Sequence, residues 1–373
     1  MKGRDFVIYL DHSATTPLCD AAKKAIIEHL DDFGNPSSSY EFARKSRVII
    51  EDARERIAKC INADPSEIYF TSGGSESNTW ALSGRMSIST EIEHHSIVPM
   101  FESMKVESNG VMSYSYVRDQ LEYFMKNYFL KPTICSCMYV NNELGTIQPV
   151  KEIADIAKKH NMLFHVDAVQ ALGHIPIDVK KIGCDMLSAS GHKFGAPKGV
   201  GILYIKNGVY INSLIHGGKQ ERGKRGGTEN VLFIASMAAA LEDAVEHMDE
   251  RNNYVKILRD KMLNKLLEID GASLNGSYEH RTPSNINICF DGVPGARLVA
   301  MCDLYGICIS SGSACNEGQT TPSHVLKAIG LSDEDALNSI RITIGHENTE
   351  EEIDKATDII TKLVKRIRDE KEN

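Results

Sequence analysis

The sequence predicts an α/β protein, because apolar segments of strand length alternate with longer amphipathic segments along most of its 373 residues. Several apolar segments, such as residues 134–140, are hydrophobic throughout, as strands covered on both faces are. The composition is that of a globular protein, with 42% hydrophobic and 25% charged residues, and it excludes disordered, collagen-like and coiled-coil chains. A chain of this length is expected to form about two domains of ~150 residues each.

Short apolar runs predict five strands in the first two thirds of the chain, at residues 68–71, 133–140, 163–167, 186–189 and 201–205. Amphipathic stretches predict helices at residues 21–29, 39–60, 151–160 and 230–267. Residues 217–229 are rich in Gly, Lys and Arg and lead directly into the last of these helices. We therefore expect a loop there rather than a linker between domains.

A smaller α/β unit is predicted after the long helix, with strands near residues 285–290 and 340–344 and a helix at residues 350–368. The boundary is expected in or near the long helix, around Glu250. The resulting expectation is a large domain of residues 12–250 and a small domain of residues 1–11 and 251–373.

The charge balance argues against binding to polyanions. There are 42 basic and 51 acidic residues, a formal net charge of −9, and no run of Lys or Arg. Nucleic acids and anionic membranes are therefore not expected as partners. No apolar run approaches the ~20 residues of a membrane-spanning helix, and residues 1–11 lack the apolar core of a signal peptide. The nine cysteines, an odd number, are typical of reduced thiols, so we expect a soluble cytoplasmic protein.

Residues 69–77 have the features of a phosphate-binding turn. An apolar strand runs into a segment of Ser and Gly, including Gly74 and Ser75, and a helix follows. Free backbone N–H groups and hydroxyls at a helix N-terminus favour anions. Taken alone, the same segment fits an ordinary Ser/Gly helix cap equally well.

Asp167 and Lys193 each follow a predicted strand. Asp167 lies at the carboxyl end of an apolar segment, where α/β sheets bind ligands, and a buried carboxylate there needs a cationic partner. Lys193 lies between a strand end and a Gly/Pro turn, where loss of solvent would lower its pKa and favour a Schiff base with an aldehyde. Alone, each reads as a helix cap or a surface charge. Together with the phosphate-binding turn, they match the needs of pyridoxal phosphate (PLP).

Two further segments carry candidate groups. Cys315 lies in a Ser- and Gly-rich stretch that is expected to be an exposed, mobile loop, so its thiol should be accessible. Most other cysteines lie in apolar runs, and the pair at 135 and 137 has no second ligand pair, so no zinc site is expected. Of the adjacent His94 and His95, at most one should face a cofactor, and both are equally compatible with an exposed loop.

The combination resembles the cysteine desulfurases, the NifS/IscS-like group of the class V aminotransferase family. The resemblance spans residues 10 to 345 in order. Its motifs lie at residues 10–17 (LDHSATTP), 33–36 (FGNP), 71–77 (TSGGSES), 140–145 (VNNELG), 165–167 (HVD), 190–193 (SGHK), 225–230 (RGGTEN) and 310–315 (SSGSAC). It implies a PLP enzyme of fold type I with a seven-stranded, mostly parallel sheet in the large domain.

The resemblance also implies a homodimer that takes sulfur from L-cysteine and leaves L-alanine. The sulfur would pass to an acceptor or an iron–sulfur scaffold protein. Cys315, in the small domain, would carry it as a persulfide and could transiently ligate an iron–sulfur cluster with the scaffold, while no resident metal is expected. By the same likeness, Arg341 would bind the substrate carboxylate, a role suited to its two-pronged donor geometry. Asn142 would help to hold cofactor and substrate.

The remaining residues that the resemblance assigns would bind the cofactor. Lys193 would bond to its aldehyde, Asp167 would pair with the pyridine nitrogen, and Gln170 would contact the phenolic oxygen. His94 would stack on the ring and transfer protons, although the short segment from Trp80 to Glu91 predicts a short strand before it. The phosphate ligands would be Gly74, Ser75, Ser190 and His192, with Thr228 from the partner subunit.

Other functions remain open at this point. A selenocysteine lyase or another class V aminotransferase would share the fold, but an aminotransferase needs no thiol at Cys315. A non-catalytic scaffold is disfavoured by the presence of both Lys193 and Cys315. A dinucleotide-binding dehydrogenase is disfavoured because no G-x-G-x-x-G follows an early strand.

Overall fold

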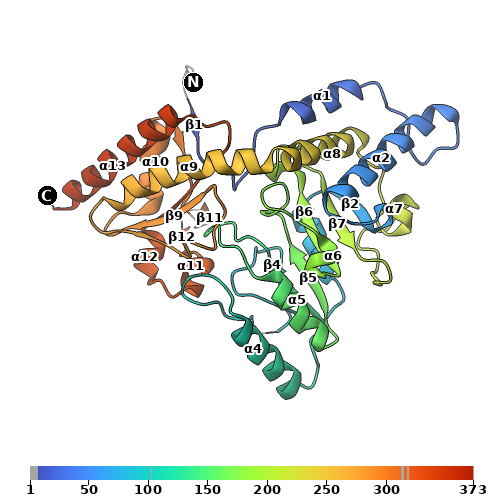
Figure 1. Ribbon diagram of the computed structural model, residues 1–373, viewed down its shortest axis with the longest axis horizontal. Coiled ribbons are helices and arrows are strands. Elements are labelled where there is room, and N and C mark those ends of the chain that lie inside the picture. The colour runs from blue at the N-terminus through green and yellow to red at the C-terminus, as the bar shows by residue number, and fades with distance from the viewer. Residues whose placement is uncertain (1–6, 102, 312–314, 317–318, 373) are drawn as a thin grey trace.

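The computed structural model describes residues 7–101, 103–311, 315–316 and 319–372; residues 315, 316, 319, 320, 371 and 372 are described by their backbone alone. A mixed, mostly parallel sheet forms the centre of the larger half (Figure 1). Its strand order is β2-β7-β6-β5-β4-β3, and only β7 runs antiparallel to its neighbours. The strands are β2 (Ile68–Thr71), β3 (Ser87–Ser89), β4 (Ile134–Met138), β5 (Leu163–Asp167), β6 (Met186–Ser190) and β7 (Gly201–Ile205).

The expected seventh strand of this sheet is absent from the described part of the chain, which corrects the prediction. The segment after the third helix is short, so β3 has only three residues. At its outer edge, Met104 meets Thr90 in a single isolated bridge. Only a few backbone hydrogen bonds join the segment around Met104 to β3, such as Met104 N to Ser89 O at 2.7 Å. They are too few to form the regular hydrogen-bond ladder of a further strand.

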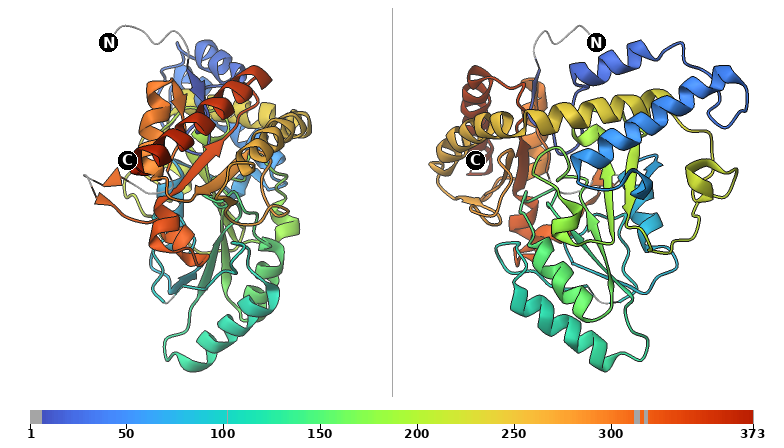
Figure 2. Two further views of the ribbon diagram at one scale, coloured as in Figure 1. Left: turned by 90° about the vertical axis from the view of Figure 1, so that its left-hand side faces the viewer. Right: turned by 45° about the vertical axis from the view of Figure 1, so that its right-hand side comes forward.

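Helices cover both faces of the sheet, as the apolar strands predicted (Figures 1 and 2). One face packs against α3 (Gly74–Leu82), whose Trp80 is fully buried beside Met186 and Leu203. The other face contributes Cys135, Phe164 and their neighbours to the main core. Helices of that core are α1 (Asp20–Glu28), α2 (Glu41–Cys60), α4 (Tyr114–Asn127), α5 (Val150–Lys159) and α8 (Val231–Glu246).

The two-residue period of the strands separates apolar from polar side chains. Phe164 and Val166 of β5 belong to the main core, so His165 and Asp167 point to the α3 face. There His165 lies between hydroxyls of the neighbouring strands: its Nδ1 is 2.8 Å from Ser136 Oγ and its Nε2 is 2.8 Å from Ser188 Oγ. The α3 face of the sheet therefore carries polar side chains, and Asp167 lies at the carboxyl end of β5.

A second core gathers the C-terminal part of the chain. Its sheet has the antiparallel order β13-β9-β8, and Ile8 and Leu10 from the N-terminal segment are buried with it. Strand β1 pairs in parallel with β10. The elements are β1 (Ile8–Tyr9), α9 (Met248–Leu267), β8 (Ala272–Leu274), β9 (Asn285–Phe290), α10 (Gly295–Leu304), β10 (Ile307–Cys308), β13 (Ser339–Thr343) and α13 (Glu350–Glu372). Val325, Leu326 and Ile329, which follow residue 250, belong instead to the main core, and the division at residue 250 stays a prediction.

The predicted long helix at residues 230–267 is interrupted, which corrects that prediction. His247 (φ −102°, ψ 11°) separates α8 from α9. Its backbone N–H donates to Asp243 O at 3.2 Å, and its ring Nδ1 lies 2.9 Å from the same carbonyl. The His247 ring therefore competes with backbone N–H groups for a carbonyl at the end of α8, where helical carbonyls lack backbone partners.

The segment at residues 217–229, expected to be a loop, contains the short element α7 (Gln220–Gly223) with left-handed backbone at Glu221 (φ 44°) and Arg222 (φ 56°). Glu221 forms a buried ion pair with Arg54, with Nη2 and Oε1 2.8 Å apart. Arg225 donates to Glu76 of α3 at 2.9 Å. These ion pairs fix the segment to α2 and to the start of α3.

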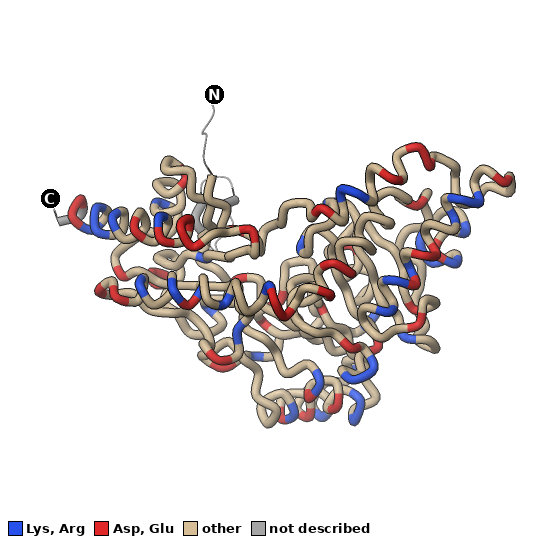
Figure 3. The backbone as a smooth tube through the Cα atoms, turned by 45° about the horizontal axis from the view of Figure 1, so that its top comes forward, with Lys and Arg blue, Asp and Glu red and all other residues tan. Residues whose placement is uncertain are grey.

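The other short elements complete the chain: η1 (Pro65–Glu67), α6 (Val179–Ile182), η2 (Gly191–Lys193), β11 (Cys315–Asn316), β12 (Gln319–Thr320), α11 (His324–Ala328) and α12 (Asp333–Leu337). Basic and acidic residues are interspersed along the backbone (Figure 3). Throughout the described ranges, every helix is either too short or too polar to cross a membrane.

We predict that His165 makes folding stability fall in mild acid. Burial lowers the pKa of His165 to about 3, whereas the unfolded residue titrates near 6.5. Below pH 6.5 the unfolded chain binds a proton that the folded chain excludes, so stability decreases as pH falls toward 3. Between pH 7 and pH 5 this residue should account for about 2 kcal/mol of the loss in the free energy of unfolding.

The measurement is urea unfolding at several pH values for wild type and His165→Gln. The variant is expected to have a shallower dependence on pH, and the exposed His216→Gln is the matched control, with an unchanged dependence. Identical slopes for wild type and His165→Gln would contradict the prediction.

Candidate functional site

The carboxyl ends of β4, β5 and β6 meet at one edge of the sheet, because the three strands are parallel. A cavity of about 380 Å³ lies there. All predicted site residues except Thr228 and Cys315 line it. In chain order they are Gly74, Ser75, His94, Asn142, Asp167, Gln170, Ser190, His192, Lys193 and Arg341. The parallel strands thus explain why residues far apart in the sequence form a single site.

Asp167 is the buried carboxylate of this cavity. Its Oδ1 accepts the Val169 N–H at 2.9 Å and its Oδ2 accepts Asn78 Nδ2 at 2.7 Å. Burial raises the pKa of Asp167 above its ordinary value. Among the ion pairs of the described residues, Asp167 has no cationic partner. A cationic group of a ligand would favour its charged form.

Lys193 presents its amine to the same cavity. Nζ donates to the carbonyl oxygens of Ser13 at 2.6 Å and Ala14 at 2.9 Å. Burial, together with the positive charge of Arg341, lowers the pKa of Lys193 to about 8. A substantial fraction of this amine is therefore unprotonated near neutral pH, as a nucleophile for a carbonyl group must be.

The start of α3 and the end of β6 form an anion-binding corner. Gly74 and Ser75 are the first residues of α3, and Ser190 ends β6. A Cβ atom at Gly74 would lie 2.6 Å from Val169 Cγ2, so glycine is required where the helix closes on the strand-end turn. Burial lowers the pKa of His192 to about 4, which makes it a neutral hydrogen-bonding group. Backbone N–H groups, hydroxyls and a neutral ring suit a phosphate.

His94 rather than His95 lines the cavity. The His95 ring lies against His324, with ring centroids 4.7 Å apart. His94 Nδ1 is 2.8 Å from Ser96 Oγ and accepts the Ser96 backbone N–H at 3.1 Å. Burial lowers the pKa of His94. The short strand expected before it is present, and His94 still reaches the site.

Arg341 lies on β13 and brings the second core to the cavity. Its Nη2 forms an ion pair with Asp11 Oδ1 at 2.7 Å, and its Nη1 donates to Asn142 O at 3.0 Å. Its Nε is buried and has no hydrogen-bond partner among the described residues. Gln170 Nε2 donates to Ser13 O at 2.8 Å. Contacts with Asp11 and Asn142 therefore hold the guanidinium of Arg341 in place beside the cavity.

Two predicted site residues lie apart from these groups. Thr228 is exposed and does not line the cavity. The backbone of Cys315 lies in β11, which pairs antiparallel with β12, so the expected loop contains a short hairpin. The Cys315 side chain, and with it the predicted exposure of the thiol, lies outside what the structure describes, as do residues 312–314 and 317–318.

The sequence did not identify Ser13, Asn78, Ser96 and Met138 as site residues, although all four line the cavity. The position of Asn78 could have been predicted, because it lies four residues after Gly74 and therefore on the same face of α3. The position of Met138 could also have been predicted, because it is the last residue of β4, which runs parallel to β5. Ser13 and Ser96 reach the site through loops, whose course no local pattern predicts.

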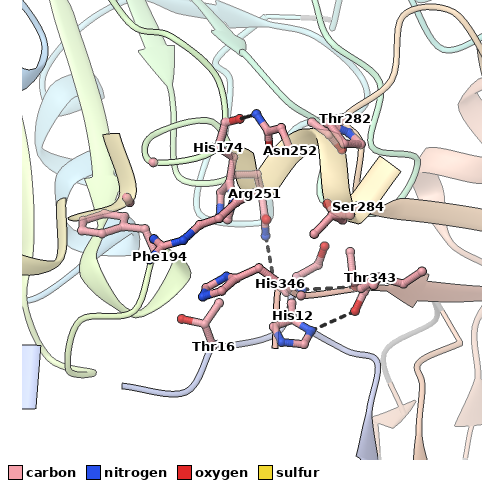
Figure 4. Close-up of a pocket in the computed structure, with 18 of the residues that line it drawn as sticks. His12, Thr16, His174, Phe194, Arg251, Asn252, Thr282, Ser284, Thr343 and His346 are labelled. Carbon is pink, nitrogen blue, oxygen red and sulfur yellow. Dashed lines mark hydrogen bonds between the residues drawn. The ribbon is translucent and has the colours of Figure 1, made fainter. Parts of the chain in front are cut away.

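A second, smaller cavity of about 100 Å³ is lined by His12, His174, Arg251 and Asn252, among other residues (Figure 4). His174 Nε2 lies 2.7 Å from the carbonyl oxygen of Lys193, and Asn252 Nδ2 donates to His174 O at 2.8 Å. On its other side, His12 Nδ1 lies 3.0 Å from Thr343 O. The contact with His174 helps to fix the backbone of Lys193, and the contact between His12 and Thr343 helps to fix the segment that contains Ser13.

The residues present fit PLP. The buried carboxylate of Asp167 matches a protonated ring nitrogen, and the amine of Lys193, whose pKa is lowered to about 8, matches an aldehyde. The corner around Gly74 and Ser190 matches a phosphate. The three groups line one cavity of a size suited to a small cofactor.

Comparison with known proteins gives concordant results. A family model described as aminotransferase class-V matches residues 8–356. The chain is 43% identical over 385 residues to a protein named cysteine desulfurase IscS from Clostridium botulinum, covering 97% of this chain and 95% of that protein. It is similar to the structure of a NifS-like protein, with a TM-score of 0.88 and 35% identity over 96% of this chain and 100% of the other. It is also similar to SspA in complex with cysteine, with a TM-score of 0.78 and 32% identity over 91% and 99% of the two chains.

We predict that Lys193 in the cofactor-free protein reacts with amine reagents with a midpoint near pH 8, instead of the ordinary 10.5. In Arg341→Met the midpoint should rise, because a repelling positive charge is removed. Brief trinitrobenzenesulfonate labelling at a series of pH values, read by mass spectrometry of the Lys193 peptide, measures both. The exposed lysines in the same digest are the internal reference. A wild-type midpoint near 10.5 would show that the site does not activate this amine.

Proposed function

Since the chain belongs to the aminotransferase class-V family, we propose that it is a PLP-dependent cysteine desulfurase, which converts L-cysteine to L-alanine and passes the sulfur to an acceptor. The observation that carries this proposal is the meeting of Asp167, Lys193 and Arg341 in one cavity. The relatives support it, since one is named cysteine desulfurase and another was solved in complex with cysteine.

The cofactor would be held at three points. Asp167 would bind the ring nitrogen, Lys193 the aldehyde carbon, and the corner formed by Gly74, Ser75, Ser190 and His192 the phosphate. Gln170 would contact the phenolic oxygen and His94 the ring face. PLP, when bound, withdraws electrons from the α-carbon of an attached amino acid and so weakens the bonds there.

The substrate would be oriented by its carboxylate. Arg341 lines the cavity, and its buried Nε has no partner in the described structure, so it has a donor to offer. Asn142, whose carbonyl binds the Arg341 guanidinium, would help to hold substrate and cofactor. With a pKa of about 8, the Lys193 amine is suited to accept the proton from the α-carbon.

Sulfur transfer is assigned to Cys315. Its thiolate would attack the substrate sulfur, so that an S–S bond forms as the C–S bond breaks. The electron pair left on carbon takes up a proton, which yields L-alanine and a persulfide on the enzyme. The persulfide would then pass its outer sulfur to an acceptor such as an iron–sulfur scaffold protein, with which Cys315 could also hold a nascent cluster.

A homodimer is part of the proposal. Thr228 is exposed and does not line the cavity of its own chain, which suits a phosphate ligand for a partner subunit. The corner between α1 and α2 exposes large apolar side chains, among them Phe33 (83% exposed) and Phe42 (54%), with ring centroids 4.9 Å apart. Clustered exposed apolar groups are typical of interfaces. Sedimentation of the purified protein should give the mass of two chains, and a monomer would contradict this part.

The cytoplasm is the proposed location. Cys135, Cys137 and Cys184 are core thiols, and burial raises the pKa of each. Such thiols are typical of a reducing compartment.

The test of the function is to incubate the PLP-loaded protein with L-cysteine. Alanine should form, and mass spectrometry should locate the added sulfur on Cys315. Cys315→Ala should bind PLP normally but lose at least 100-fold in sulfur transfer, since it lacks the nucleophile. Lys193→Ala should lose both the covalently bound cofactor and alanine formation.

Cys60→Ala is the matched control, because burial raises the pKa of that thiol to about 11 and leaves little thiolate. It should keep wild-type activity. Wild-type sulfur transfer in Cys315→Ala would refute the role of Cys315. Transamination without sulfur release would refute the desulfurase in favour of an aminotransferase.

A further inference from the structure

Two side chains, those of Asn78 and Ser96, connect Asp167 to His94 in the wall of the cavity. Asn78 on α3 is 1% exposed and donates from Nδ2 to both Asp167 Oδ2, at 2.7 Å, and Ser96 Oγ, at 2.9 Å. Ser96 Oγ in turn lies 2.8 Å from His94 Nδ1. No role was expected for Asn78 or Ser96 from the sequence.

The direction of each hydrogen bond in this chain is fixed. The Ser96 backbone N–H points at His94 Nδ1 at 3.1 Å, and a backbone N–H can only donate, so Nδ1 must carry a lone pair. The Ser96 hydroxyl has accepted a hydrogen from Asn78, and its own hydrogen is therefore available for Nδ1. The neutral ring must then carry its proton on Nε2.

The orientation of the Asn78 amide leaves its oxygen without a hydrogen bond, and this energetic cost supports the assigned hydrogen-bond directions. Both hydrogens of its amide group are used, while its Oδ1 is buried without a partner in the described structure. A flipped amide would place that oxygen against the carboxylate of Asp167, which is repulsive. A buried unsatisfied acceptor costs about 1–3 kcal/mol, so the orientation is maintained by the groups on the other side of the amide.

We propose that Asn78 and Ser96 are positioning residues that couple the ionised carboxylate of Asp167 to His94 and hold the His94 ring as its Nε2–H tautomer. The inference deepens the proposed function, because it defines which nitrogen of His94 can act in the cavity. His94 then offers an N–H donor from Nε2, while its Nδ1 is occupied by two donors from Ser96.

The electrostatic surroundings of His94 agree with a neutral ring. Burial lowers its pKa, the carboxylate of Asp167 acts in the opposite direction, and His95, Lys193 and His324 lower it further. Protonating Nδ1 would also place its hydrogen against the Ser96 backbone N–H. Loss of Asn78 would leave the Ser96 hydroxyl able to rotate and accept a hydrogen from Nδ1. The Ser96 backbone N–H, at 3.1 Å, would then be the one donor of this pair that still favours the Nε2–H form, so the Nδ1–H and doubly protonated forms would gain population relative to wild type.

The test uses the full-length, cofactor-free protein labelled with ¹⁵N-histidine. Two-bond ¹H–¹⁵N correlation spectra distinguish the tautomers, and the spectrum of His94→Gln assigns the signals. Wild type should show Nε2–H. In Asn78→Ala and Ser96→Ala, Nδ1–H should appear and the titration midpoint of His94 should rise by about one pH unit, a tenfold gain in proton affinity. Ser96→Thr, which keeps the hydroxyl, should behave as wild type.

Thr79→Ala is the matched control for α3, since Thr79 is the exposed neighbour of Asn78 and should leave the His94 signals unchanged. An Nδ1–H tautomer in wild type would overturn the proposal, and so would an unchanged tautomer and midpoint in folded Asn78→Ala, with folding checked by circular dichroism. Because neither cofactor nor substrate is present, these outcomes are independent of whether the protein proves to be a cysteine desulfurase.

Discussion

The site is organised around a buried carboxylate that forms no ion pair with any residue the structure describes. Asp167 ends the central strand β5, on the polar face of the sheet, where burial works against its charge. Hydrogen bonds from Val169 and Asn78 compensate only part of that cost. A protonated ring nitrogen would supply the missing charge, so the same feature that destabilises the carboxylate makes the cavity selective for a cationic heterocycle.

The sheet permits this arrangement because its two faces differ. One face is apolar and packs against the main core. The free energy gained by burying these apolar side chains offsets the cost of burying polar groups at the site. The other carries His165 and Asp167 on alternate positions of β5, with Ser136 and Ser188 satisfying both nitrogens of the histidine. His165 is therefore fully hydrogen-bonded, whereas Asp167, at the edge of the cavity, has hydrogen bonds but no ion-pair partner among the described residues. The negative charge that is not balanced by a cation thus lies where a ligand would bind.

The second core completes the site from the opposite side. Arg341 on β13 pairs with Asp11, and both lie beside the main-chain carbonyls that hold the Lys193 amine. The positive charge of the arginine helps to lower the pKa of the lysine, and under the proposed function the same group would bind the substrate carboxylate. The arrangement of these three residues depends on packing between segments more than three hundred residues apart in the chain.

The sequence by itself determined the α/β class and the positions of most strands of the two sheets, but it predicted neither α4 nor α10. It also indicated that Asp167, Lys193 and the Gly74 turn belong to one site, and the structure brings them to one cavity. Local periodicity and strand-end chemistry encode these features. Only the tertiary structure decided the six-stranded sheet, the break at His247 and the parts played by Asn78 and Ser96. Those depend on edge hydrogen bonds, on a side chain competing at a helix end and on loop packing, all of which are set by contacts between residues that no local pattern joins.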